Sequence, residues 1–329
     1  MVRYYLYFLM AFCAASVGVV PLFADFSLLR QVSEAHRTNW EYVQSWRGNV
    51  EILDETTSPA VGMEDAKWWS KVSFAYQSSP HAVRWNWQMT ESENAKIHTP
   101  ISNGLIKDGT VTVLEVNKID GEAEAQRSVR ILDLKPFELG PYVQVFSPMY
   151  YVGYRGDNVA DWFDHVRREA ETADAAELKG WEVSRDGDRV ILSFESPSLL
   201  NRYTADLSKG GNLISFEAEE REDSVVVSKG NWDWQYEQQD RIWLPTNLTF
   251  STIEFARAGE DIEKGTEKSK RVRTISWKTT ELNSSLVDEF TLEAIGIEKG
   301  DDISNTTTGA VLHSRSSQEP TAHSRSCND

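Results

Sequence analysis

Aromatic and polar residues alternate along residues 231–237, and this segment has the clearest pattern in the chain. Its aromatic positions are Trp232, Trp234 and Tyr236. A period of two places alternate side chains on opposite faces of a strand, so these three are predicted to share one face. A second apolar run follows a polar interruption at 238–241. Pro245 lies in that run and predicts a bulge, an edge or a break, because proline cannot donate a ladder hydrogen bond. The segment 231–255 is therefore predicted to be a long antiparallel hairpin.

Similar alternation recurs on both sides of a helical interruption. Residues 83–89 place Trp85 and Trp87 on one face of another predicted strand. Amphipathic spacing predicts a helix over 26–46, and a second helix over 157–178 lies within an insert at about 136–180. In a sheet protein such an insert usually covers a face. The predicted fold class is mainly β (α+β): one highly curved antiparallel sheet with helices covering its concave side.

The two ends of the chain differ in composition from the middle. Residues 1–24 carry one positive charge, then an uncharged apolar run, and they predict a secretory signal peptide. An uncleaved N-terminal membrane anchor is the alternative, because the run is about as long as the shortest spanning helices. Residues 305–329 are nearly devoid of apolar side chains and are predicted to be disordered. The folded domain is therefore expected over 25–304, in a periplasmic or secreted protein or in one anchored to the inner membrane.

Charge and motifs exclude several classes of function. The net charge of −17 argues against nucleic-acid binding, which needs a basic surface. The sequence has no phosphate-binding glycine loop, no paired-cysteine metal spacing and no nucleophile motif. Asp161 and His165 are four residues apart on a predicted helix, and a surface pair explains them better than a metal site. We therefore expect a non-enzymatic protein with no catalytic residue, no metal and no cofactor.

The aromatic strand faces are the candidate binding surface. They contain Trp85, Trp87, Trp232, Trp234 and Tyr236. Packing of a core between the sheet and its helices is the simpler explanation for any one of these residues. The functional alternative is that a strongly curved sheet leaves part of this surface to line a ligand cavity. The sequence alone leaves both interpretations open.

The order of elements resembles a known family. An N-terminal helix, several strands, a helical interruption and long hairpins containing WDWQYEQQDRIWLPT are followed by VDEFTLEAIGIEKGDDISN at 287–305. This arrangement resembles the LolA/LolB-like lipoprotein-carrier superfamily of the bacterial envelope, in a planctomycete-type exported form. The resemblance implies an antiparallel half-barrel, closed on its concave side by helices, with an apolar cavity for lipoprotein acyl chains.

Two functions of different kinds follow from these expectations. The first is a carrier that binds the acyl chains of a lipoprotein, or another lipid, in the half-barrel cavity. The second is an envelope interaction or sensor protein with a filled core, whose sheet edge or outer face binds a partner.

Overall fold

The computed structural model describes most of the predicted domain. The described residues are 25–58, 65–93, 101–107, 110–117, 126–132, 159–174, 176–257, 259–260, 263–286, 288–305 and 311–313. The predicted signal peptide or anchor at 1–24 lies outside them, as does the first part of the insert at 136–158. In the described part of the chain, no helix is both long enough and apolar enough to cross a membrane.

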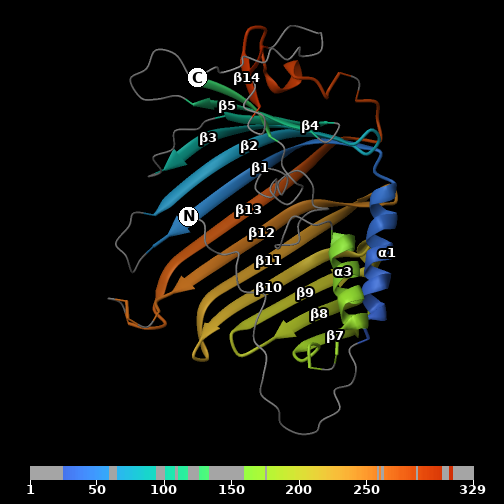
Figure 1. Cartoon of the computed structure of the whole chain (residues 1–329), viewed down its shortest axis with the longest axis vertical. Helices are drawn as coiled ribbons and strands as arrows, with labels where there is room; N and C mark the ends of the chain where they lie inside the picture. Colours follow the sequence, from blue (N-terminus) through green and yellow to red (C-terminus); the bar gives the residue numbers. More distant parts are fainter. Residues whose placement is uncertain are drawn as a thin grey trace, which may run out of the picture.

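The chain is mostly β and forms one large open sheet (Figure 1). The strands are β1 (Ser45–Thr57), β2 (Ala66–Gln77), β3 (Ala82–Glu93), β4 (Ile101–Lys107), β5 (Thr110–Asn117), β6 (Gln126–Leu132), β7 (Trp181–Asp186), β8 (Arg189–Glu195), β9 (Leu199–Asp206), β10 (Asn212–Glu222), β11 (Val225–Gln239), β12 (Ile242–Phe255), β13 (Glu267–Leu282), β14 (Asp302–Asn305) and β15 (Val311–His313). Their order in the sheet is β15-β14-β6-β5-β4-β3-β2-β1-β13-β12-β11-β10-β9-β8-β7.

The prediction of a purely antiparallel sheet is wrong at one edge. Strand β14 pairs in parallel with β6, and β15 then pairs antiparallel with β14. The reason is that the chain returns to the far edge of the sheet after β13, so β14 meets β6 through a long connection rather than a hairpin. Residues 311–313 belong to this added edge although they fall within the predicted tail. Asn305, the first residue of that predicted tail, ends β14, and residues 306–310 and 314–329 lie outside the described residues.

Two helices accompany the sheet within the described ranges. Helix α1 spans Ser27–Glu41 and α3 spans Val159–Thr172. The prediction of a helix over 26–46 extended too far, because Ser45 already begins β1. The apolar residue Trp46 fits a helical and a strand period equally well, so periodicity alone could not locate the boundary. Short 3-10 turns, η4 (Leu207–Lys209) and η5 (Glu293–Ile295), complete the elements.

A glycine turn lets α1 approach the sheet closely. Gly210 and Gly211 follow η4 with φ values of 68° and 67°, in the left-handed region that favours glycine. A Cβ atom at Gly211 would lie 2.6 Å from the carbonyl oxygen of Val32 in α1. The Asn39 side chain then accepts from the backbone N–H of Trp243 at 2.8 Å and donates to the Trp243 carbonyl at 3.1 Å. These contacts fix α1 against the sheet (Figure 1).

The two faces of the sheet bury separate cores. The helix face is the one on which α1 and α3 pack, and its core includes Phe74, Trp85, Phe216, Trp234 and Leu248. The coil face is the opposite one. Over β2–β6 it is covered by the C-terminal coil, which we define as residues 283–301. That second core includes Ala75, Leu105, Leu114, Phe290 and Ile295.

The predicted hairpin at 231–255 is confirmed as β11 and β12. Trp232 lies opposite Phe250 and Trp234 opposite Leu248. The next pair joins Tyr236 to Pro245, so the register shifts by one residue there. Of the alternatives that proline allowed, the structure has the bulge.

Candidate functional site

The five predicted aromatic residues share the helix face but fall in two groups. Trp85 and Trp87 lie on β3, whereas Trp232, Trp234 and Tyr236 lie on β11. Strands β2, β1, β13 and β12 separate the two groups. At about 4.8 Å per strand, five steps correspond to ~24 Å measured along the sheet. Both groups nevertheless contact one continuous hydrophobic core.

Trp85 is a packing residue of this core. Its side chain is 1% exposed, and it lies opposite Phe74 and Gly104 on the neighbouring strands. A Cβ atom at Gly104 would lie 2.0 Å from the Trp85 ring, so the indole occupies the space above that glycine. Trp87, two residues further along β3, is only half-buried. The accessible part of the first group is therefore Trp87.

The β11 residues differ in how much of each side chain remains accessible. Trp234 is buried, with 5% exposure, whereas Trp232 and Tyr236 are half-buried. The Tyr236 hydroxyl donates to the carbonyl oxygen of Leu213 at 2.8 Å. Burial raises the pKa of the Tyr236 phenol well above its usual range. Tyr236 is therefore neutral at physiological pH and acts as a hydrogen-bond donor that joins β11 to β10.

Trp232 belongs to a row of aromatic rings in contact that crosses four strands. We call this row the aromatic ladder; its members are Tyr203 on β9, Phe216 on β10, Trp232 on β11 and Phe250 on β12. Successive ring centroids lie 4.3, 4.6 and 5.1 Å apart. These distances fall at the short end of the range in which aromatic pairs attract each other. The ladder forms because each pair lies directly opposite in the antiparallel register.

Helix α3 covers one end of the aromatic ladder. The ring of Trp162 lies 4.3 Å from that of Tyr203, and Tyr203 and Phe216 are 5% and 6% exposed. The other end, at Trp232 and Phe250, is half-buried. The ladder thus runs from beneath the helix toward a more accessible part of the same face.

Beyond Phe250 the same row continues with charged residues that the sequence analysis missed. Phe250 lies opposite Arg273 on β13, and Arg273 lies opposite Asp54 on β1. The Asp54 side chain is 0% exposed and accepts hydrogen bonds from the guanidinium groups of Arg271 and Arg273. The sequence alone could have predicted this position. Arg271 and Arg273 alternate with their neighbours in step with Ile275 and Trp277, and a period of two places all four side chains on the same, apolar face of the strand.

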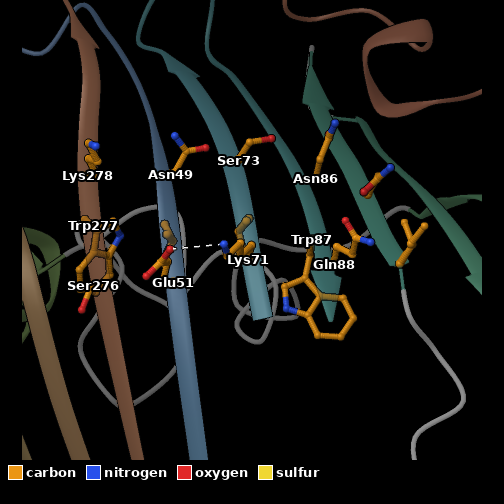
Figure 2. Close-up of a pocket in the computed structure, with 14 residues that line it drawn as sticks. Asn49, Glu51, Lys71, Ser73, Asn86, Trp87, Gln88, Ser276, Trp277 and Lys278 are labelled. Carbon is orange, nitrogen blue, oxygen red and sulfur yellow. Dashed lines mark ion pairs between the residues drawn. The ribbon is translucent and has the colours of Figure 1, made fainter. Parts of the chain in front are cut away.

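A groove with a mostly polar lining lies on the coil face, and Trp87 and Trp277 also contribute to its lining (Figure 2). Its volume is about 810 Å³. The polar side chains that line it are Asn49, Glu51, Lys71, Ser73, Asn86, Gln88, Asn103, Ser276 and Lys278. Lys71 and Glu51 form an ion pair across its floor at 3.7 Å. Its lining suits a polar partner better than an acyl chain.

The side chains in the described ranges include no group of three or more His, Cys, Asp or Glu residues that could hold a metal ion. Asp161 of the predicted helix pair forms an ion pair with Arg37 of α1 at 2.9 Å. His165 lies 4.0 Å from Glu169, with more than half of its side chain exposed. This part of α3 therefore has the geometry of a solvated helix surface.

Comparisons with known proteins found similarities in structure but none in sequence. No family model matches, and no curated protein matches. A LolA superfamily protein from Nitrosomonas europaea is similar over 82% of this chain and 97% of its own, at 10% identity and a TM-score of 0.31. A putative outer membrane lipoprotein-sorting protein domain from Vibrio parahaemolyticus is similar over 82% and 99%, at 8% identity and a TM-score of 0.36.

A third solved structure, a porin-like protein from Bacteroides uniformis, is similar over 70% of this chain and 95% of its own, at 9% identity and a TM-score of 0.22. The first two descriptions name the kind of protein that the sequence resembles.

Proposed function

We propose that this chain is an exported, non-enzymatic envelope protein that binds an acyl chain, of a lipoprotein or another lipid, on the helix face of its sheet. In this proposal the sheet curves into a half-barrel around the helix face, with α1 and α3 on its concave side. The observation that carries the proposal is the aromatic ladder, whose Tyr203 end is buried under Trp162 while its Trp232 and Phe250 end is half-buried.

The hydrophobic effect gives such binding a favourable free energy. Transfer of a methylene group out of water contributes about 0.8 kcal/mol, so a sixteen-carbon chain gains on the order of 10 kcal/mol before ordering costs. The same chain gains a comparable amount in a membrane. A carrier must therefore bind the acyl chain less tightly when it releases it. Movement of Trp162 on α3 away from Tyr203 would lower the affinity by uncovering the Tyr203 end of the ladder.

Native mass spectrometry of protein purified from its own envelope tests the proposal. We expect an acylated species to copurify, and we expect Trp232→Ser to lose it because the ladder is interrupted. Trp69→Ser is the matched control, because Trp69 is also half-buried. Trp69 alternates with Trp68 along β2 and therefore lies on the face of the sheet opposite to the aromatic ladder. A ligand-free wild-type protein, or equal retention of ligand in the two variants, would overturn the proposal.

Export is proposed from residues 1–24 and is tested separately by the mass of the native N-terminus. A mature protein that begins at Asp25 would indicate a cleaved signal peptide, whereas an intact N-terminus in the membrane fraction would indicate an anchor. Recovery of the intact chain from the cytosol would refute both forms of the proposal.

The polar groove favours a second candidate function, that of an envelope interaction protein. Its Asn, Gln and Lys side chains offer hydrogen bonds to a polar protein surface rather than to a lipid. We expect a copurifying protein to be lost from Lys71→Glu, which reverses one charge in the groove, and to be retained by Trp232→Ser. The opposite pattern would favour the aromatic ladder.

A further inference from the structure

We propose that the polar groove on the coil face binds an extended, β-linked oligosaccharide that lies across strands β13, β1, β2, β3 and β4. This inference goes beyond acyl binding on the helix face and does not depend on it. It also replaces the protein partner of the second candidate function with a carbohydrate, and the two occupants predict different outcomes.

One row of polar side chains crosses the groove from β13 to β4 (Figure 2). We call it the polar row; its members are Lys278, Asn49, Ser73, Asn86 and Asn103. Each member lies directly opposite the next one on the neighbouring strand. Side chains at such positions have Cβ atoms about 4.5–5.5 Å apart. The polar row therefore offers hydrogen-bonding groups at regular intervals across five strands.

A second row lies two residues away from the first on four of these strands. Its members are again direct partners, and they are Ser276, Glu51, Lys71 and Gln88. Glu51 and Lys71 pair with each other at 3.7 Å, and 72% and 67% of their side chains are exposed. A side-chain amide or hydroxyl can both donate and accept hydrogen bonds, as can each hydroxyl of a sugar ring. The two rows therefore match a ligand that is dense in hydroxyl groups.

The spacing of the polar row favours a sugar chain over a peptide. Neighbouring strands are about 4.8 Å apart, which is close to the advance per ring of a β-linked hexose chain. An extended polypeptide advances by about 3.3 Å per residue and falls out of step with the row. Four strand intervals, or ~19 Å, would hold about four rings. The volume of the groove, about 810 Å³, lies within the roughly 300–1,000 Å³ of small-molecule sites.

The C-terminal coil holds one end of the polar row in place. Nδ2 of Asn86 donates to the carbonyl oxygen of Ala294 at 3.2 Å, and Nδ2 of Asn103 donates to that of Ile295 at 3.0 Å. Side chains that are ordered in advance lower the entropy cost of binding. Oδ1 of Asn86 is buried and accepts no hydrogen bond from the described residues. A ligand hydroxyl at this end of the groove would supply the missing donor.

Calorimetric titration of the full-length mature protein with matched tetrasaccharides tests this site. Cellotetraose and chitotetraose are β-linked and extended, whereas maltotetraose is an α-linked, curved isomer of cellotetraose. We expect at least one β-linked tetramer to bind at least about tenfold more tightly than maltotetraose, because the curved chain misses several of the hydrogen bonds. Added salt should change this affinity by less than about twofold, because the ligand carries no charge.

Single amide and side-chain deletions locate the ligand in the groove. Asn49→Ala and Gln88→Ala should each lower the affinity for the β-linked tetramer by about fivefold, as expected for the loss of one hydrogen bond. Both side chains are exposed, so neither change removes a buried contact. Gln235→Ala is the matched control. Gln235 is an exposed amide that alternates with Trp234 along β11, so it lies on the coil face but outside the groove. This variant should bind like the wild type.

The possible outcomes separate this site from the other proposals. Failure of both β-linked tetramers to bind, or equally tight binding of maltotetraose, would overturn the oligosaccharide. Unchanged affinity in Asn49→Ala and Gln88→Ala would overturn the groove as the place of binding. A copurifying protein that is lost from Lys71→Glu, together with no tetrasaccharide binding, would assign the groove to a protein partner. Absence of acyl binding would leave this inference intact, because the ladder lies on the opposite face of the sheet.

Discussion

The two faces of the sheet are covered in different ways. On the helix face, α3 meets the sheet through apolar contact of Trp162 with Tyr203, and its polar contacts with other described elements run to α1. On the coil face, side chains of the sheet donate hydrogen bonds to carbonyl oxygens of the C-terminal coil. These donors are Asn86, Asn103, Lys107 and Arg127.

The difference determines which cover can move. Separating α3 from the ladder exposes apolar surface, and a bound acyl chain could replace that contact at little cost. Separating the coil would break hydrogen bonds between the sheet and the coil backbone, and each partly buried group left unpaired costs about 1–3 kcal/mol. The coil also includes Glu289, which pairs with Arg84 at 2.8 Å. We therefore interpret α3 as the movable cover and the coil as a permanent one.

The largest effect is expected from Phe163→Ala, which would weaken the movable cover. Phe163 on α3 is 0% exposed, and truncation of a buried phenylalanine costs about 3–5 kcal/mol. We expect the loss to be local. Hydrogen exchange should accelerate in α3 and in the facing side of α1, while amides of β1–β3 remain protected.

Phe290→Ala provides the comparison on the other face, where Phe290 is 8% exposed. We expect this change to lower the denaturant concentration at the midpoint of global unfolding. We expect no separate local opening, because hydrogen bonds join the coil to the sheet. Uniform loss of protection in Phe163→Ala, equal to that in Phe290→Ala, would contradict the distinction between the two covers.

A smaller effect is expected from pH, and it acts on α1. His36 is 1% exposed and packs against Trp40; burial first, and the charge of Arg37 second, lower its pKa to about 3. In the unfolded chain, His36 has a pKa near 6.5 and binds a proton that it does not bind in the folded state. The free energy of unfolding therefore falls as the pH drops below about 6.5. Between pH 8 and 5 this group alone should remove about 2 kcal/mol.

Denaturant titrations at several pH values measure this contribution. His36→Leu should flatten the dependence between pH 5 and 8, whereas His165→Leu, at an exposed position of α3, should leave it unchanged. An acid-induced loss of equal size in wild type and His36→Leu would show that other groups cause it.

The smallest effect is expected from a single hydrogen bond of the permanent cover. Asn103→Ala removes a bond of 3.0 Å to the carbonyl oxygen of Ile295 and should lower the free energy of unfolding by about 1 kcal/mol. Asn49→Ala, in the same polar groove, should change it by less than about 0.5 kcal/mol. Equal effects of the two changes would argue that hydrogen bonds to the coil do not stabilise it.

The sequence determined the local structure of this protein. Alternation at Trp232, Trp234 and Tyr236 predicted a shared strand face, and Pro245 predicted an irregularity in the hairpin; the structure confirms both. These features follow from the two-residue period of a strand and from the missing N–H of proline, which need no information about distant residues. Trp46 was ambiguous for the same reason, because a local pattern cannot separate the last turn of a helix from the start of a strand.

The tertiary structure alone decided which distant residues meet. Pairing of β14 with β6, contact of Trp162 with Tyr203, and burial of Asp54 between Arg271 and Arg273 join positions far apart in the chain. Strand order depends on the free energy of the whole sheet. A period of two predicts which face of the sheet a side chain occupies, but it does not predict which residue lies beside it on the adjacent strand. The arginines on the apolar face were visible in the sequence, yet only the register of β13 against β1 showed that a buried carboxylate holds them.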